Sequence, residues 1–116
     1  MADVTIYHNP SCSKSRETLE LIRARGIEPN VIEYLKTPPD AKTLSRLLIQ
    51  LDIDAADLLR KKEDEFSELS LANKLEDRKE LILAMVTHPI LIERPIVVCA
   101  DRACLGRPPE QVLEIL

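Results

Sequence analysis

Cys12 is the residue in this chain that is best placed for nucleophilic chemistry. It follows a short β-rich segment and Pro10, and it stands at the start of an expected helix. Unpaired backbone N–H groups and the helix dipole favour negative charge at such a position, and therefore favour the thiolate. A free thiol, with a pKa of roughly 8.5, is only a few per cent ionised at neutral pH. We expect position 12 to hold an activated thiolate.

The charges beside this cysteine favour a second anion at the same place. Lys14 and Arg16 occupy the first turn of the expected helix, and Glu17 comes only afterwards. Acidic residues are the ones that stabilise a helix N-terminus, so cations there are consistent with an anion that binds from outside. The alternative is a buried or surface cysteine whose charged neighbours are accidental.

Ser15 stands where a Cys-x-x-Cys motif would have its second cysteine, so Cys12 cannot close a local disulfide. A single activated thiolate suggests nucleophilic attack that an external thiol completes. His8 could donate a hydrogen bond or positive charge to the sulfur, or it could be a strand-end histidine in a turn. Cys99 is expected to pack as a small hydrophobic residue, and a resolving role for Cys99 or Cys104 remains an alternative.

Three arginines could bind an anion near this thiol. Arg60 begins the run Arg60-Lys61-Lys62, which by itself would be a solvated face; Arg94 precedes Pro95; and Arg107 follows Gly106 near the start of a final helix. Their spacing alone does not bring them together. If the fold does, three guanidinium groups would suit a tetrahedral oxyanion.

The order of predicted elements indicates an α/β protein. A strand at 4–7, a helix at 13–25 and a strand at 31–35 favour a parallel pair with a right-handed crossover. Apolar periodicity and capping residues then predict three helices and, after them, two strands and a final helix: 40–51, 54–60, 76–88, 95–98, 102–105 and 109–116. His88 is expected to cap the third of these helices. This order predicts one domain, 1–116, with a thioredoxin-like core and mixed sheet (about 1–37 and 90–116) and a helical insertion (about 38–89).

Composition narrows the function classes. The chain has 116 residues, a net charge of −4 and three cysteines. It lacks the overall basic field that a sequence-independent nucleic-acid binder needs, and its apolar runs are far shorter than the ~20 residues that span a bilayer. An odd cysteine count without an export signal favours reduced thiols in the cytoplasm. We expect no metal, no nucleic-acid partner and no membrane partner.

Four blocks of the chain resemble the glutaredoxin-dependent arsenate reductase (ArsC) family, in the family's order and across essentially the whole sequence. The blocks are Tyr7-His8-Asn9-Pro10-Ser11-Cys12-Ser13-Lys14-Ser15-Arg16, Leu59-Arg60-Lys61, Glu93-Arg94-Pro95-Ile96-Val97-Val98 and Gly106-Arg107-Pro108. Within them, Cys12-Ser13-Lys14-Ser15-Arg16-Glu17-Thr18 and Gly106-Arg107-Pro108-Pro109-Glu110-Gln111-Val112-Leu113 look closer to a YfgD-like branch of the family.

The resemblance implies a thioredoxin-like fold with a helical insertion and a cis peptide bond before Pro95. It also implies that Cys12 attacks arsenate to form a covalent arsenic(V) thioester, as part of arsenical resistance. Glutathione, a co-substrate rather than a tightly bound cofactor, then adds to the arsenic, and glutaredoxin resolves the adduct as arsenite leaves. By the same resemblance, two residues keep the thiol ionised and three hold the oxyanion: His8 and Ser15, and Arg60, Arg94 and Arg107.

Two other functions are weighed against arsenate reduction. One is a glutathione-linked thiol oxidoreductase of the same family that acts on another oxyanion or an organic disulfide. The other is a Spx-like transcriptional regulator, a thioredoxin-fold relative that binds RNA polymerase. Such regulators commonly use a Cys-x-x-Cys switch, and the serine at position 15 disfavours that function here.

Overall fold

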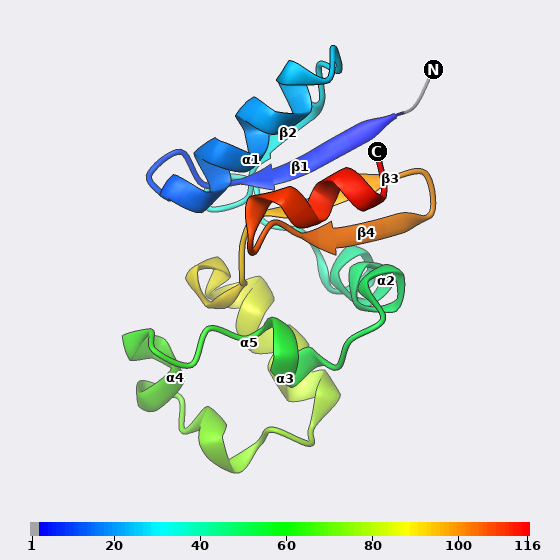
Figure 1. Ribbon diagram of the computed structural model, residues 1–116. Helices are drawn as coiled ribbons and strands as arrows, with labels where there is room; N and C mark the ends of the chain where they lie inside the picture. Colours follow the sequence, from blue (N-terminus) through cyan, green and yellow to red (C-terminus); the bar gives the residue numbers. More distant parts are fainter. Residues whose placement is uncertain (1–2) are drawn as a thin grey trace. The chain divides into compact units, whose positions relative to one another are not determined.

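The computed structural model describes residues 3–116, which form two compact units (Figure 1). One unit comprises the chain up to Thr37 together with Arg94–Leu116, and the other comprises Pro38–Glu93. The second unit thus ends four residues beyond the expected limit of the helical insertion. We call them the sheet unit and the helical unit and describe each by itself.

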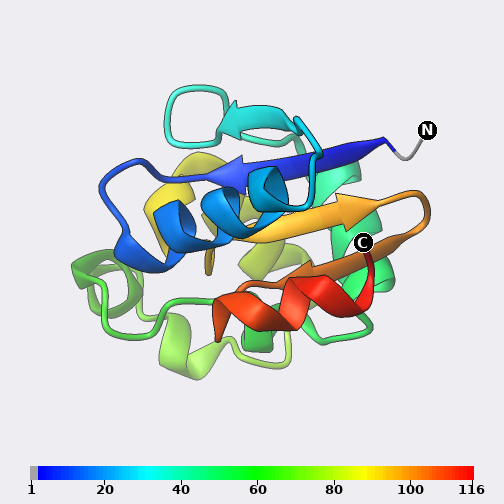
Figure 2. The same cartoon turned by 45° about the horizontal axis from the view of Figure 1, so that its top comes forward.

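The sheet unit contains a mixed four-stranded sheet in the order β2-β1-β3-β4. The central strand β1 runs parallel to β2 and antiparallel to β3, which is antiparallel to β4. Figures 1 and 2 show α1 and the C-terminal helix η3 side by side on one face of this sheet. The bounds are β1 Val4–His8, α1 Ser13–Ala24, β2 Asn30–Glu33, β3 Ile96–Cys99, β4 Arg102–Leu105 and η3 Pro109–Glu114. The expected mixed α/β sheet is confirmed.

The core of the sheet unit is aliphatic and lies between the sheet and these two helices. Because side chains alternate along a strand, Val4, Ile6 and His8 of β1 point to the same buried side. Cys99 is 8% exposed and packs in this core as a small hydrophobic residue, as predicted. The other buried members of the core cluster are Ile22, Val97 and Val112.

The final helix differs from its prediction. The sequence predicts a regular helix over 109–116, but η3 is a 3-10 helix that ends at Glu114. Pro108 and Pro109 at its start carry no backbone N–H, and Val112 is its buried anchor in the core. Apolar residues at 112, 113 and 116 give the same signal for either helix type, so the pattern alone does not separate them.

The helical unit contains the three predicted helices in the predicted order, together with one further α-helix and two short 3-10 helices. Asp40 and Asp77 cap α2 and α5 by accepting hydrogen bonds from the backbone N–H groups of Thr43 (2.8 Å) and Glu80 (3.2 Å). His88 ends α5 as its C-cap, as predicted, and donates its N–H to the carbonyl of Ala84 at 2.8 Å. The bounds are α2 Ala41–Leu51, α3 Ala55–Leu58, α4 Asp64–Glu68, η1 Leu71–Asn73, α5 Arg78–Thr87 and η2 Pro89–Leu91.

Helix α4 was not predicted, and its composition explains why. None of its five residues is buried, so it has no apolar stripe that a periodicity search could detect. The core of the helical unit instead comes from α2, α3 and α5, with Leu44, Leu47, Leu48, Leu58, Leu81 and Met85 at most 2% exposed.

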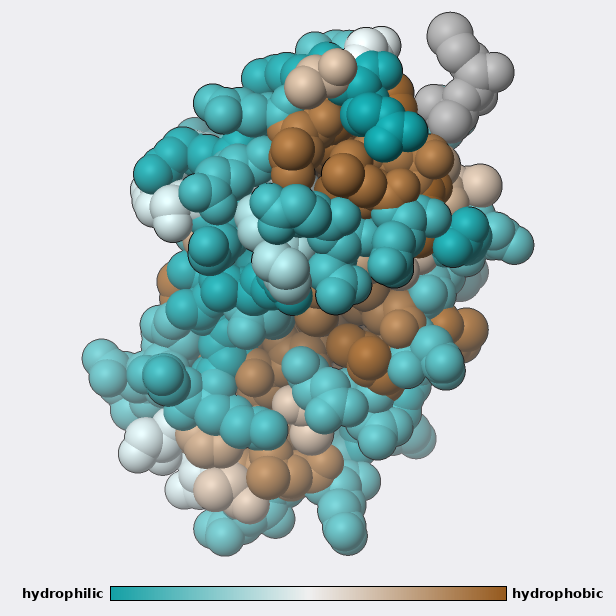
Figure 3. Space-filling model, viewed as in Figure 1, coloured by the Kyte–Doolittle hydropathy of each residue, from teal (hydrophilic) through white to brown (hydrophobic). Residues whose placement is uncertain are grey.

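The surface is mainly hydrophilic, with apolar side chains grouped in patches on the face shown in Figure 3. Within residues 3–116, no helix has both the length and the apolar character needed to cross a membrane.

Candidate active site

The sheet topology explains how three loops meet at one edge of the sheet unit. Ile96, the first residue of β3, pairs with Tyr7 near the end of β1 and with Leu105 at the end of β4. Because both pairings are antiparallel, the loops that follow β1 and β4 lie beside the loop that precedes β3. These three loops carry Cys12, Arg107 and Arg94, respectively.

The loop after β1 presents Cys12 at the N-cap of α1. Asn9 shapes this loop: its carbonyl accepts from the N–H of Cys12 at 3.0 Å, and its side-chain oxygen accepts from the N–H of Ser11 at 3.0 Å. The carbonyl of Cys12 then accepts the first helical hydrogen bond, from Arg16, also at 3.0 Å. The half-buried thiol is therefore held where free N–H groups of the helix point toward it.

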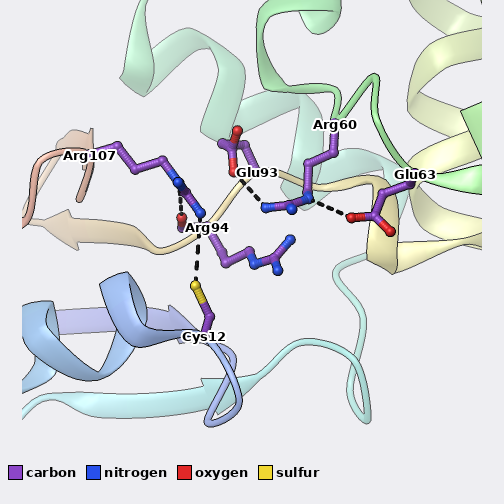
Figure 4. Close-up of polar contacts among 6 residues, drawn as sticks. All are labelled: Cys12, Arg60, Glu63, Glu93, Arg94 and Arg107. Carbon is purple, nitrogen blue, oxygen red and sulfur yellow. Dashed lines mark hydrogen bonds and ion pairs between the residues drawn. The ribbon is translucent and has the colours of Figure 1, made fainter.

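Four donors surround the sulfur of Cys12. Burial raises the pKa of this thiol, but hydrogen bonds from the Ser15 backbone, the Arg94 side chain and the Lys14 backbone outweigh it, and the pKa is lowered overall. Arg107 Nη2 lies 3.8 Å from Sγ (Figure 4). The predicted activated thiolate thus has a physical basis in helix N–H groups and two guanidinium groups.

The two arginines are also linked to each other. Arg107 Nε donates to the carbonyl oxygen of Arg94 at 2.8 Å, a contact that Figure 4 shows beside the sulfur. The peptide bond before Pro95 is cis, the geometry that the resemblance implied, and the bond before Pro108 is cis as well. The structure therefore brings Cys12, Arg94 and Arg107 together.

His8 is connected to the Cys12 sulfur through Ser15, whose hydroxyl it contacts and whose backbone N–H faces the sulfur. Its ring Nδ1 is 2.6 Å from the hydroxyl of Ser15, and the same hydroxyl accepts from the N–H of Asn9 at 3.0 Å. Burial lowers the pKa of His8; Glu33 raises it in part, and Arg23 and Arg16 lower it further. A neutral ring that accepts the Ser15 proton is consistent with both hydrogen bonds. In this arrangement His8 acts on the loop rather than as a cation beside the thiol.

Arg60 belongs to the helical unit, where it is held by two carboxylates rather than by solvent. Its Nε contacts Glu63 and its Nη1 contacts Glu93, both at 3.0 Å (Figure 4). Its backbone N–H donates to the carbonyl of Leu91 at 2.7 Å. The interpretation of Arg60 as part of a solvated basic face is therefore wrong, whereas its role in oxyanion binding stays a prediction.

The two carboxylates that hold Arg60 within the helical unit were not identified from the sequence. The spacing of Arg60 and Glu63, three residues apart, is the signal that could have found their ion pair. Glu93 is 33 positions from Arg60 and had no such signal. Among residues 3–116, no group of three or more His, Cys, Asp and Glu side chains is placed to hold a metal ion.

All three cysteines are free thiols. Cys12 and Cys104 should nevertheless differ in reactivity, because their pKa values are shifted in opposite directions. Burial, with a smaller contribution from Glu114, raises the pKa of Cys104, whereas that of Cys12 is lowered. Because the thiolate is the reacting form, iodoacetamide at neutral pH should modify Cys12 first, and its rate should level off at a lower pH than that of Cys104. Peptide mass spectrometry after timed quenching measures each rate. Equal rates for Cys12 and Cys104 would contradict the proposed activation.

Ser15→Ala distinguishes the contribution of the Ser15 hydroxyl from that of its backbone N–H. The variant keeps the N–H that faces the sulfur but removes the partner of His8 Nδ1 and Asn9 N–H inside a fully buried site. We expect a loss of about 1–3 kcal/mol in the free energy of unfolding, with only a small change in the pKa of Cys12. Chemical denaturation and the alkylation profile measure the two effects. Ser13→Ala, the same change at an exposed position two residues earlier, is the control and should change neither.

Comparison with known proteins identifies the family to which this chain belongs. The model of the ArsC family matches residues 7–115. The chain belongs to the ArsC family. The Escherichia coli (strain K12) protein named "Uncharacterized protein YfgD" is 56% identical over 114 residues, which are 97% of this chain and 96% of that protein. An arsenate reductase of the same organism is 49% identical over 116 residues, which are 100% of this chain and 82% of that one.

A solved structure of an ArsC relative agrees with the architecture. The arsenate reductase from Vibrio cholerae has 53% sequence identity and a TM-score of 0.95, and the match covers 98% of each chain. The thioredoxin-like fold expected from the order of elements is confirmed.

Proposed function

We propose that this ArsC-family protein is an arsenate reductase that converts arsenate to arsenite through a covalent bond between Cys12 and arsenic. The observation that carries the proposal is the Cys12 sulfur, which two guanidinium groups and the N-terminal N–H groups of α1 surround. Relatives of about 50% identity that are named arsenate reductase support the choice of arsenate as the oxyanion.

The first step is nucleophilic attack. The Cys12 thiolate attacks the arsenic of arsenate, an As–S bond forms, and one As–O bond breaks as its oxygen leaves as water after protonation. Arg94 and Arg107 hold the remaining oxygens and balance their charge. Arg60 is proposed as a third guanidinium for the same anion, as the family resemblance implies.

Two external thiols complete the reaction. The thiol of glutathione displaces a second oxygen as water and becomes bonded to arsenic. A glutaredoxin thiolate then attacks the glutathione sulfur: the S–S bond of a mixed disulfide forms, the bond between glutathione sulfur and arsenic breaks, and its electron pair stays on arsenic, which becomes As(III). Hydrolysis of the remaining As–S bond releases arsenite and restores Cys12. Reduced thiols of this kind are abundant in the cytoplasm, where we place the protein.

A second candidate rests on the 56% identity to YfgD. It is a glutathione-linked thiol oxidoreductase that uses the same thiolate on another substrate. A Spx-like function is disfavoured because Ser15 provides no second thiol for a switch.

An arsenate reduction assay tests the proposal. Purified protein, arsenate, glutathione, glutaredoxin and a glutathione-recycling system should give arsenite and consume NADPH. Omission of either glutathione or glutaredoxin should return the rate to that of a reaction without the protein. A thiolate at Cys12 that reacts rapidly with iodoacetamide, together with no arsenite production, would support the second candidate instead.

A further inference from the structure

Gly106 occupies a position in the sheet unit where space, rather than backbone conformation, requires glycine. It is buried, and its φ lies outside the left-handed region. A Cβ added there would collide with Oγ1 of Thr18 and would lie 2.7 Å from Cγ of Pro95, distances that real Cβ atoms essentially never show. Glycine therefore allows three segments to meet: α1, the loop before β3 and the end of β4.

Each of these three segments carries a part of the candidate active site. Thr18 lies on α1, six residues or about 1.7 turns after Cys12, and is fully buried. Pro95 directly follows Arg94, and its carbonyl accepts the N–H of Gly106 at 3.0 Å. Gly106 directly precedes Arg107. The contact at Gly106 thus joins Arg107 and the residue after Arg94 to the helix that begins at Cys12.

The side chain of Thr18 is held in one orientation and cannot easily rotate away from a new neighbour. Its hydroxyl donates to the carbonyl of Lys14 at 2.7 Å, which holds the side chain against α1. The ring of Pro95 is equally constrained by its own covalent geometry. A side chain at position 106 would therefore be accommodated by separation of the segments rather than by side-chain rotation.

We propose that Gly106 and Thr18 are positioning residues of the active site, whose close contact sets the separation between Cys12 and the arginine pair Arg94 and Arg107. The contact between Arg107 Nη2 and Cys12 Sγ is already long, at 3.8 Å. An added separation of several tenths of an ångström would place it beyond hydrogen-bond reach. The effect on turnover rests on the proposed function, whereas the effect on the thiol rests on geometry alone.

Gly106→Ala tests this directly in the full-length protein. As the guanidinium groups move away, the pKa of Cys12 should be higher than in the wild type, as measured by the pH profile of Cys12 alkylation. The kcat/KM for arsenate should fall by about 10- to 100-fold, the upper figure being the effect of a misplacement of about 1 Å. Wild-type values of both quantities in the folded variant would overturn the proposal.

Double variants identify Thr18 as the residue responsible. Gly106→Ala with Thr18→Ala removes both Thr18 atoms that crowd the new Cβ but leaves Pro95, so the pKa of Cys12 should lie between the wild-type and single-variant values. Gly106→Ala with Thr18→Ser keeps the hydroxyl and should show no such recovery. If the single variant does not fold, the alanine double variant should fold with a raised pKa; its failure to fold, or a wild-type pKa, would overturn the proposal.

Gly26→Ala is the matched control. Gly26 follows the C-terminal end of α1 with a φ of +78°, and a Cβ there meets nothing within 4 Å. Alanine at this position costs stability through backbone strain alone. The pKa of Cys12 in this variant should equal that of the wild type. An equal shift of this pKa in both glycine variants would show that Gly106→Ala acts only by lowering stability, and would contradict a positioning role for Gly106. A wild-type protein that does not reduce arsenate, with thiol shifts as expected, would refute the proposed function and leave this inference standing.

Discussion

Cys12→Ala is expected to abolish arsenate reduction and to leave the fold intact. In the proposed reaction this side chain supplies the attacking sulfur, and no other thiol lies at the start of α1. Removal of a covalent nucleophile typically costs a factor of at least about 10³ in kcat, so the rate should fall to that of the reaction without protein.

The fold should tolerate this change because the backbone of residue 12 makes the local hydrogen bonds. The N–H of Cys12 donates to the carbonyl of Asn9, and its own carbonyl accepts from the N–H of Arg16. We expect a change of less than about 1 kcal/mol in the free energy of unfolding. Circular dichroism and denaturant unfolding measure this.

Cys104→Ala provides the matched control for the nucleophile. It makes the same substitution on β4, at a thiol whose pKa is raised by burial, and it should retain arsenate reduction. Turnover that persists in Cys12→Ala, or that disappears equally in Cys104→Ala, would refute the role of Cys12 and restore Cys104 as a candidate redox residue.

Arg94→Lys should weaken oxyanion binding even though it preserves the positive charge. The guanidinium of Arg94 donates to the Cys12 sulfur, and its planar fork can hold two oxygens of a tetrahedral anion. An ammonium group is a point charge and cannot replace a bidentate fork. The loss of one charged hydrogen bond, about 1.5–3 kcal/mol, corresponds to an increase in the KM for arsenate of roughly 10- to 150-fold.

A second measurement separates binding from activation of the thiol in this variant. Because the Arg94 side chain also lowers the pKa of Cys12, the alkylation profile of Arg94→Lys should move to higher pH. Arg23→Lys is the control: Arg23 forms a forked ion pair with Glu28 near the far end of α1, and its replacement should leave the KM for arsenate and the kcat unchanged. Wild-type KM and kcat in Arg94→Lys would remove Arg94 from the anion site.

Local elements of this protein were predictable because local interactions form them. The alternation at residues 4–7 predicted β1, and the caps at Asp40 and Asp77 marked the starts of α2 and α5. Such signals act within one or two turns, so they do not require the tertiary fold. Helix α4, with no buried face, and the 3-10 geometry of η3 had no local signal to distinguish them.

The same distinction between local and tertiary interactions applies to the candidate active site. The sequence by itself was enough to propose Cys12 as the nucleophile, because the placement of Cys12 at a helix start, without a second cysteine at position 15, is a local property. Only the tertiary structure decided which cations reach its sulfur, since Arg94 and Arg107 are more than 80 residues away and meet it through antiparallel pairing on both sides of Ile96. Tertiary packing likewise directed His8 to Ser15 and left glycine as the residue that fits at position 106.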